Sequence, residues 1–459
     1  MASAAEQMAK SINFDTFSKA KELQKRILFT LGILLVYRFG TFIPVPGIDP
    51  AQFAIIFDNL GGTGGGIFGN ANMFSGGAIE RMSIFALNVM PYITASIIVQ
   101  MMTTASPTLS ALKKEGEVGR QQINQYTRYL TVMFAVLQSF GISVGLQSAG
   151  ATLDSMPGWF FILTGVVTLT GGTIFLMWIG EQVTARGIGN GVSLIIFAGI
   201  IAEMPRAIFN LLNQAQNSST NVVFIIGIAA MVIGLVVFMV FVERAQRRLL
   251  IQYPKRQQGN RVSQGQNSFL PLKINTSGVI PPIFASAILL LPTTAIGFAS
   301  GGGAAAQAPA SGPIQGVLQW MAVNFGSGTP GFIIAYGLMI AFFTFFYTSI
   351  TFNPEETADN LRKHGGFIPG IRPGKNTAAY IDYVLTRLTT IGAVYLVFCC
   401  LLPEILRVYY PQIPFYIGGM SLLIVVSVTM DTVAQIQSHL IAHQYDGMIK
   451  KSRLGGRKR

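Results

Sequence analysis

The chain has 459 residues, of which 51% are hydrophobic and only 11% are charged. Soluble domains carry about 25% charged residues, so this chain has too few to cover a globule in water. The composition therefore excludes an ordinary soluble protein and predicts a protein that lies mostly within a membrane.

The basic residues alternate along the chain. Twenty-eight of the 32 Lys and Arg residues lie in every second gap between long apolar stretches, and the exceptions are Arg38, Arg81, Arg206 and Arg407. Such alternation is the positive-inside pattern of a multi-pass membrane protein. It predicts that both termini and the basic loops face the cytoplasm. There the net charge of +13 can meet anionic lipids or an acidic or nucleic-acid partner.

Ten apolar segments are long enough to cross a membrane, because a helical span needs about 20 mostly apolar residues. Helices are expected because backbone groups in lipid must be hydrogen-bonded internally. The fifth segment is the least certain, because Gly199 and Glu203 interrupt it. The segments are approximately 27–45, 82–103, 129–149, 159–179, 190–209, 221–242, 275–296, 331–352, 386–405 and 414–434.

Few charged residues enter these segments. Arg38 lies near the middle of the first, whereas Glu404 and Asp431 lie near the ends of others. Ion- and proton-coupled carriers usually place acidic or histidine groups at mid-membrane. The scarcity of such groups argues against a proton-coupled carrier, while a secondary transporter of small solutes stays open as an alternative.

Glycine is unusually dense at 61–77, which reads GGTGGGIFGNANMFSGG. This composition does not form a membrane helix by itself. It predicts either a flexible external loop or a short re-entrant element packed into a cavity, where irregular backbone is tolerated. Pro91 in the second segment, and Pro281 and Pro282 in the seventh, are expected to bend their helices.

Two long polar gaps lie on the predicted cytoplasmic side, at about 243–274 and 353–385. Each is too short to bury a core of its own. They are either docking surfaces on stiff hairpins or plain solvated loops.

Motifs for chemistry are incomplete. Gly370 to Lys375 resembles the end of a phosphate-binding loop, but Asn376 stands where Ser or Thr is required. His439 and His443 are one helical turn apart without an evident third metal ligand. We therefore expect no enzyme activity, no metal site and no cofactor.

Several long segments resemble the SecY family, the central subunits of the bacterial protein-conducting channel. The resemblance extends from about residue 20 to 450. It is carried by 40–49 (GTFIPVPGID), 73–100 (MFSGGAIERMSIFALNVMPYITASIIVQ), 113–129 (KKEGEVGRQQINQYTRY), 180–200 (GEQVTARGIGNGVSLIIFAGI), 241–261 (FVERAQRRLLIQYPKRQQGNR) and 352–374 (FNPEETADNLRKHGGFIPGIRPG).

The resemblance implies an all-α polytopic membrane protein with ten transmembrane helices. These would form two pseudo-symmetric five-helix halves around a central pore, with a re-entrant plug. The chain would divide into a cytoplasmic segment, two halves and a basic cytoplasmic tail, at 1–26, 27–209, 210–435 and 436–459. A lateral gate would open between spans 2–3 and 7–8.

The resemblance also assigns roles to residues inside the pore. A constriction ring is expected at Val89, Ile93, Ile196, Ile283 and Ile424, with Ile97 as a looser candidate. A narrow aliphatic ring dewets and blocks ions, yet can part around an extended chain. The plug, about 61–77, would include Gly64, Gly65, Gly66, Ile67, Phe68, Gly69, Asn70, Asn72 and Phe74.

The two long loops would dock cytoplasmic partners through Arg256, Arg261 and Arg372. Arginine suits ribosomal RNA because its planar fork pairs with phosphate. The implied partners are the membrane subunits SecE and SecG, the SecA ATPase, the ribosome, signal peptides with unfolded secretory chains, and anionic lipids. The expected function is a passive channel in the bacterial inner membrane that passes unfolded proteins and releases transmembrane segments into lipid.

Overall fold

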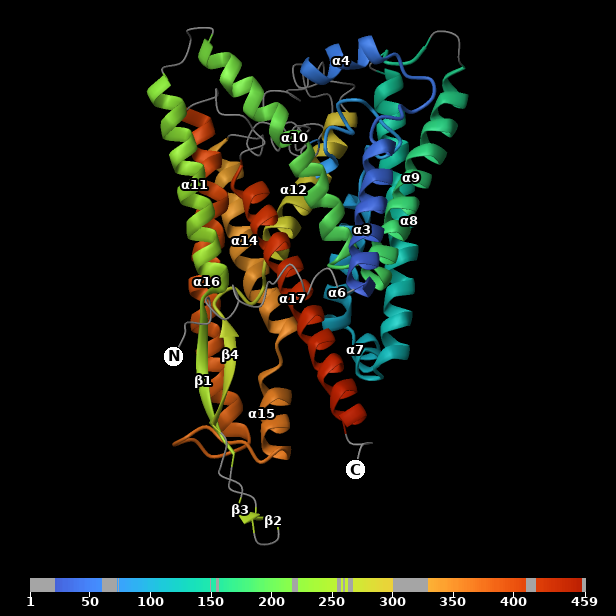
Figure 1. Cartoon of the computed structure of the whole chain (residues 1–459). Coiled ribbons are helices and arrows are strands. Elements are labelled where there is room, and N and C mark those ends of the chain that lie inside the picture. Colours follow the sequence, from blue (N-terminus) through green and yellow to red (C-terminus); the bar gives the residue numbers. More distant parts are fainter. Residues whose placement is uncertain are drawn as a thin grey trace.

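The computed structural model is a helical bundle with a β-hairpin at one end (Figure 1). It describes residues 21–59, 72, 74–148, 150–153, 157–216, 222–253, 257–258, 261–262, 267–299, 329–409 and 418–455.

Each of the ten predicted spans overlaps one helix of the structure. Within the described residues, seven helices are long and apolar enough to cross a membrane by length and composition. Among the other three, α6 is only 16 residues long and α3 carries basic residues at both ends. The ten helices are α3 (Lys21–Gly40), α6 (Met90–Ala105), α8 (Glu117–Ser148), α9 (Gly158–Arg186), α10 (Gly191–Gln216), α11 (Val222–Arg244), α12 (Ile280–Ala299), α14 (Pro330–Thr351), α16 (Lys375–Tyr409) and α17 (Gly419–Gly455).

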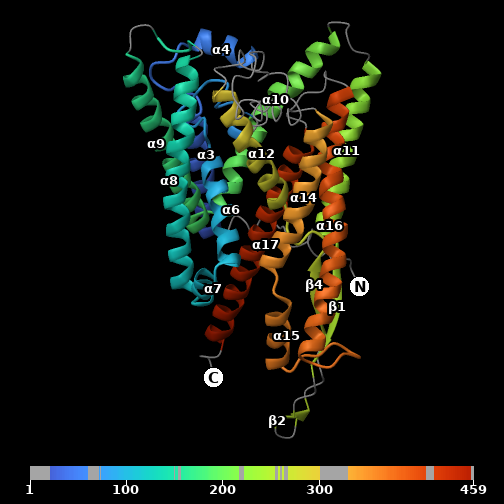
Figure 2. The ribbon, with the colours of Figure 1, turned by 180° about the vertical axis from the view of Figure 1, so that it is seen from behind.

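The bundle has two sides with three helices between them. Helices α3, α6, α8 and α9 lie on one side, α11, α14 and α16 lie on the other, and α10, α12 and α17 lie between (Figures 1 and 2). Helix α10 packs against α9 and α17, while α12 packs against α14 as well as α6 and α8. The two sides therefore meet along α10, α12 and α17.

The second span differs from its prediction as a helix over 82–103. Helix α6 begins only at Met90, and the preceding residues form successive turns with positive φ at Met82 and Asn88. Its Pro91 lies in the first helical turn, where the missing N–H is no loss. Pro281 and Pro282 likewise lie at the start of α12, so the expected bends at these prolines are wrong.

Two further expectations about the spans are corrected. Helix α3 ends at Gly40, so Arg38 lies in the last turn of the helix and not near its middle. The uncertain fifth span is one helix that includes both Gly199 and Glu203. The helix tolerates Glu203 within the span because this carboxylate pairs with arginine side chains inside the protein, as described below.

The long loops on one side of the bundle form a joint structure. Strand β1 (Gln246–Gln252) pairs antiparallel with β4 (Asn267–Lys273), and the short β2 (Gln257–Gln258) pairs with β3 (Arg261–Val262) near the tip. Gln252 exchanges backbone hydrogen bonds with Phe367 of the second loop, at 2.9 and 3.0 Å. Leu249 and Leu272 of the hairpin pack against Ile381 and other residues at the start of α16. Each loop is too short for a core, but the two share one.

Within the described residues, three short helices accompany the bundle. Helix α4 (Pro50–Asn59) covers the end of the bundle opposite the hairpin (Figure 1) and buries Phe53 and Phe57 against α8 and α9 residues. Helix α7 (Pro107–Lys114) follows α6, and α15 (Pro354–Lys363) lies beside the hairpin.

Candidate functional site

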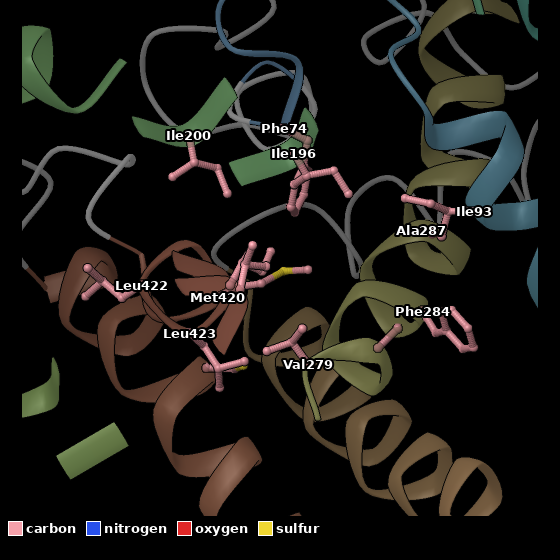
Figure 3. Packing of buried hydrophobic residues seen from close by; sticks show 14 of the residues in the cluster. Phe74, Ile93, Ile196, Ile200, Val279, Phe284, Ala287, Met420, Leu422 and Leu423 are labelled. Atoms are coloured by element: carbon pink, nitrogen blue, oxygen red, sulfur yellow. The ribbon is translucent and has the colours of Figure 1, made fainter. Parts of the chain in front are cut away.

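One cluster of buried hydrophobic side chains joins α6, α10, α12 and α17 where the two sides meet. Figure 3 shows part of it, with Ile196 from α10, Phe284 from α12 and Met420 from α17. All six residues expected near the pore constriction belong to this cluster or pack on it. Val89, Ile93, Ile97, Ile196 and Ile424 are at most 6% exposed, and Ile283 is half-buried.

Three of these residues follow one face of a helix. Ile93 and Ile97 lie in α6 one turn apart, and Val89 is the residue just before its first turn. The Ile93 N–H donates to the Val89 carbonyl at 3.0 Å, so the helical spacing continues back to Val89. Val89, Ile93 and Ile97 thus contribute a row of aliphatic side chains to the cluster.

The chemistry of these side chains is uniform. Valine and isoleucine have no hydrogen-bonding group, so they bind neither water nor ions in a narrow passage. Their contacts are non-directional dispersion and hydrophobic contacts, which depend on shape and not on sequence. Such an arrangement can seal against ions and still yield to an extended polypeptide.

Only the end of the expected plug lies within the described residues. Phe74 is buried in the same cluster as the aliphatic residues, as Figure 3 shows. Asn72 is also buried; its side chain accepts from the Glu80 N–H at 3.0 Å, and Asn88 donates to the Phe74 carbonyl. The other expected plug residues, Gly64, Gly65, Gly66, Ile67, Phe68, Gly69 and Asn70, lie outside the described residues.

The irregular backbone after the plug is hydrogen-bonded to a distant segment. The Val45 N–H donates to the Met82 carbonyl at 2.9 Å, and the Ile84 N–H donates to the Ile43 carbonyl at 2.9 Å. These two bonds supplement the local turn bonds of 82–89, since backbone inside a membrane protein has to be hydrogen-bonded. The residues from 76 to 89 thus form a non-helical entry to α6 that is hydrogen-bonded to residues 43–45.

A group of charged residues beside Phe74 was missed by the sequence analysis. Glu203 of α10 is buried, and its Oε1 lies 3.2 Å from Arg38 Nη2 and 3.3 Å from Arg81 Nη2. Arg206 Nη1 lies 3.0 Å from Glu80 Oε1 and 4.0 Å from Glu203 Oε2. We call these five residues the charge cluster.

A signal for this cluster was present in the sequence. Arg38, Arg81 and Arg206 are three of the four basic residues that break the positive-inside alternation. Basic residues on the wrong side of such a pattern need a local reason, and here each pairs with a carboxylate. The exceptions to the pattern were more informative than the pattern about this part of the protein.

The predicted docking residues lie at the hairpin end of the molecule. Arg372 is exposed in the turn before α16, between Gly370 and Gly374, whose φ values are +83° and +108°. Its carbonyl accepts from Thr377 Oγ1 at 3.0 Å, which fixes the turn. Arg261 lies in β3 near the hairpin tip, paired with Gln258, whereas Arg256 lies outside the described residues.

Comparison with known proteins identifies the chain. Its fold and its apolar meeting of two helical sides define a multi-pass membrane channel subunit. The SecY family model matches residues 83–433. The chain is 49% identical over 455 residues to the protein translocase subunit SecY of Escherichia coli K12, covering 98% of this chain and 99% of that protein. It belongs to the SecY family.

Solved structures agree in fold at low sequence identity. One, described as a protein conducting channel, matches with a TM-score of 0.61 and 18% identity over 90% of this chain and 92% of that one. Sec61 in a canine ribosome–channel complex from the endoplasmic reticulum matches with a TM-score of 0.56, 18% identity and the same coverage. Both likenesses support the ten-helix channel fold.

Proposed function

We propose that this chain forms the pore of a protein translocase in the bacterial inner membrane. It passes unfolded secretory proteins across the membrane and releases their apolar segments sideways into lipid. The observation that carries the proposal is the cluster in which aliphatic residues of α6, α10, α12 and α17 meet with Phe74. A solute carrier would need polar groups at such a meeting point, whereas a passage for any polypeptide needs sealing without chemical preference.

The seal has two parts in this proposal. Val89, Ile93, Ile196, Ile283 and Ile424, with Ile97 beside them, form the constriction that keeps ions out. Residues 61–77 form the plug, and the buried Phe74 is the part of it that packs against the constriction. A translocating chain displaces the plug and parts the aliphatic side chains.

The sideways exit lies where α12 packs against α6 and α8. These contacts join the two sides of the bundle, so their separation would open the pore towards lipid. A signal peptide favours the open state to the extent that it binds that state better than the closed one. The halves that separate correspond to 27–209 and 210–435.

The joined hairpin and α15–α16 turn serve as the docking surface for cytoplasmic partners. The shared core of Leu249, Leu272 and Ile381 makes this surface stiff, and Arg372 is exposed on it. We assign it to the SecA ATPase and to ribosomal RNA, with Arg256 and Arg261 as the proposed RNA contacts. The relative in the canine complex is itself bound to a ribosome.

The remaining assignments follow the charge pattern and the family. Both termini and the basic loops face the cytoplasm, where the basic residues also meet anionic lipids. SecE and SecG complete the complex in the membrane. The chain performs no chemistry of its own and uses no cofactor, so a partner ATPase or the growth of the nascent chain drives transport.

Reconstitution tests the proposal. Vesicles that contain this chain, SecE and SecA should protect a secretory substrate from added protease when ATP is present. Matched vesicles without this chain, or without ATP, should leave the substrate fully digested. Equal digestion with and without this chain would contradict the proposed function.

A further inference from the structure

The charge cluster joins the base of the plug to two helices of the bundle. Glu80 and Arg81 belong to the non-helical segment that follows the plug, whereas Arg38 lies in α3 and Glu203 and Arg206 lie in α10. The Arg81–Glu203 pair and the Arg206–Glu80 pair therefore both connect this segment to α10. Arg38 adds a hydrogen bond of 2.6 Å from Nη1 to the Gly76 carbonyl.

The plug base is pressed against α10 at this point. Gly76 and Gly77 have φ values of +64° and +80°, and a Cβ added to Gly76 would lie 2.7 Å from Gly199 Cα. A Cβ added to Gly77 would lie 2.6 Å from Glu203 Oε1. Only glycine permits this approach, so the segment and the carboxylate are in direct contact.

Two of the cations are close to each other as well. The guanidinium groups of Arg38 and Arg81 lie 5.0 and 4.4 Å from the ring centre of the same residue, Phe42. Like charges at such separation repel, and the repulsion is strong where solvent is scarce. Glu203, only 2% exposed at its side chain, is the anion that bridges them. Its removal leaves repulsion between α3 and the plug base where there had been attraction.

We propose that Glu203 is a positioning residue that holds the plug base in the closed position. The inference rests on the plug role proposed above for 61–77. In the closed state the single negative charge of Glu203 attracts both Arg38 and Arg81 and offsets their mutual repulsion. Opening carries Arg81 away from α10 and exposes both charges, so the closed state is favoured until an incoming chain supplies the difference. Glu203 thereby contributes to the threshold for opening.

The test measures ion conductance of the resting channel reconstituted with SecE. Glu203→Gln should raise it roughly tenfold, because two partly buried like charges without their bridging anion repel each other. The double variant Glu203→Gln with Arg81→Gln should conduct less than Glu203→Gln alone, since it removes the repulsion. A purely structural role predicts the opposite, with the double variant leaking more, and that result would overturn the proposal.

Controls separate this inference from the plug role itself. Glu181→Gln breaks the Arg128–Glu181 pair, with contacts of 2.8 and 2.6 Å between α8 and α9, and should leave conductance at the wild-type value. Deletion of residues 65–72 should leak in any case. A leak in the deletion but not in Glu203→Gln overturns the role of Glu203 alone. Wild-type conductance in both overturns the plug.

A second variant tests the proposal if Glu203→Gln fails to fold. Should Glu203→Gln not accumulate, Arg81→Gln leaves the Arg38–Glu203 pair intact and still removes one ion pair between the plug base and α10. It should leak more than wild type and less than the plug deletion. Wild-type conductance of Arg81→Gln would then refute the proposal.

Discussion

Replacement of Ile93, Ile196 and Ile283 together by asparagine should make the resting channel conduct ions. Asparagine has as many side-chain heavy atoms as isoleucine but occupies less volume, so the change adds polarity and slightly widens the constriction. Keeping a polar side chain dry and without a partner costs roughly 1–3 kcal/mol by mutational data, so three cost roughly 3–9 kcal/mol. Because 1.4 kcal/mol is a factor of ten, even the lower value shifts the balance towards a hydrated constriction by more than about 100-fold.

The measurement is single-channel conductance of the reconstituted complex without substrate. A control variant puts three asparagines at Leu146, Phe161 and Leu169, which are buried but belong to the separate cluster beneath α4. Each control residue is at least as buried as Ile283, so a leak caused by general destabilisation would appear in the control as well. Equal conductance of the two variants, or wild-type conductance of the first, would refute the assignment of the constriction.

Three further outcomes are expected. Deletion of residues 65–72 should give a milder or transient leak, since neighbouring plug residues can take the place of the deleted ones. A permanent leak equal to that of the triple asparagine variant would contradict this. A cysteine at Lys375 should react with a membrane-impermeant thiol reagent only from the cytoplasm and one at Ser311 only from outside, and the reverse labelling would overturn the topology. Arg372→Glu should sharply reduce SecA-driven translocation at normal abundance, with a smaller loss for Arg372→Lys; wild-type rates at equal amounts of complex would remove this arginine from the docking surface.

The spans were predictable because each helix must be apolar along its own length to cross the hydrocarbon. That requirement is local, so composition alone located all ten helices. The failure at 82–89 has a non-local cause. This segment reads as apolar as its neighbours, but its backbone forms tight local turns and makes two hydrogen bonds to Ile43 and Val45, far away in the sequence. No local pattern reports such a partner.

The constriction residues were proposed only through the family resemblance, and their role in the pore stays a prediction. An isoleucine in a span is most often lipid-facing or buried in a core, and nothing in the neighbourhood of Ile196 or Ile424 distinguishes a pore position. The charge cluster could not be derived in advance, because Arg38 and Glu203 are 165 residues apart. In the sequence Glu203 is visible only as a charged residue that interrupts a span. Its pairing with two arginines becomes evident only in the structure.

The proposed constriction and the charge cluster have different chemistry, because a protein-conducting pore must pass any polypeptide and yet close. Aliphatic side chains at the constriction accept any polypeptide because their contacts have no direction, but for the same reason they cannot define a single closed state. Directional bonds have to do that elsewhere. In this protein they lie beside the constriction, in the backbone hydrogen bonds of 82–84 and in the ion pairs of Glu203. In the roles proposed here, the aliphatic residues seal the constriction against ions, whereas the ion pairs of Glu203 set the threshold for opening.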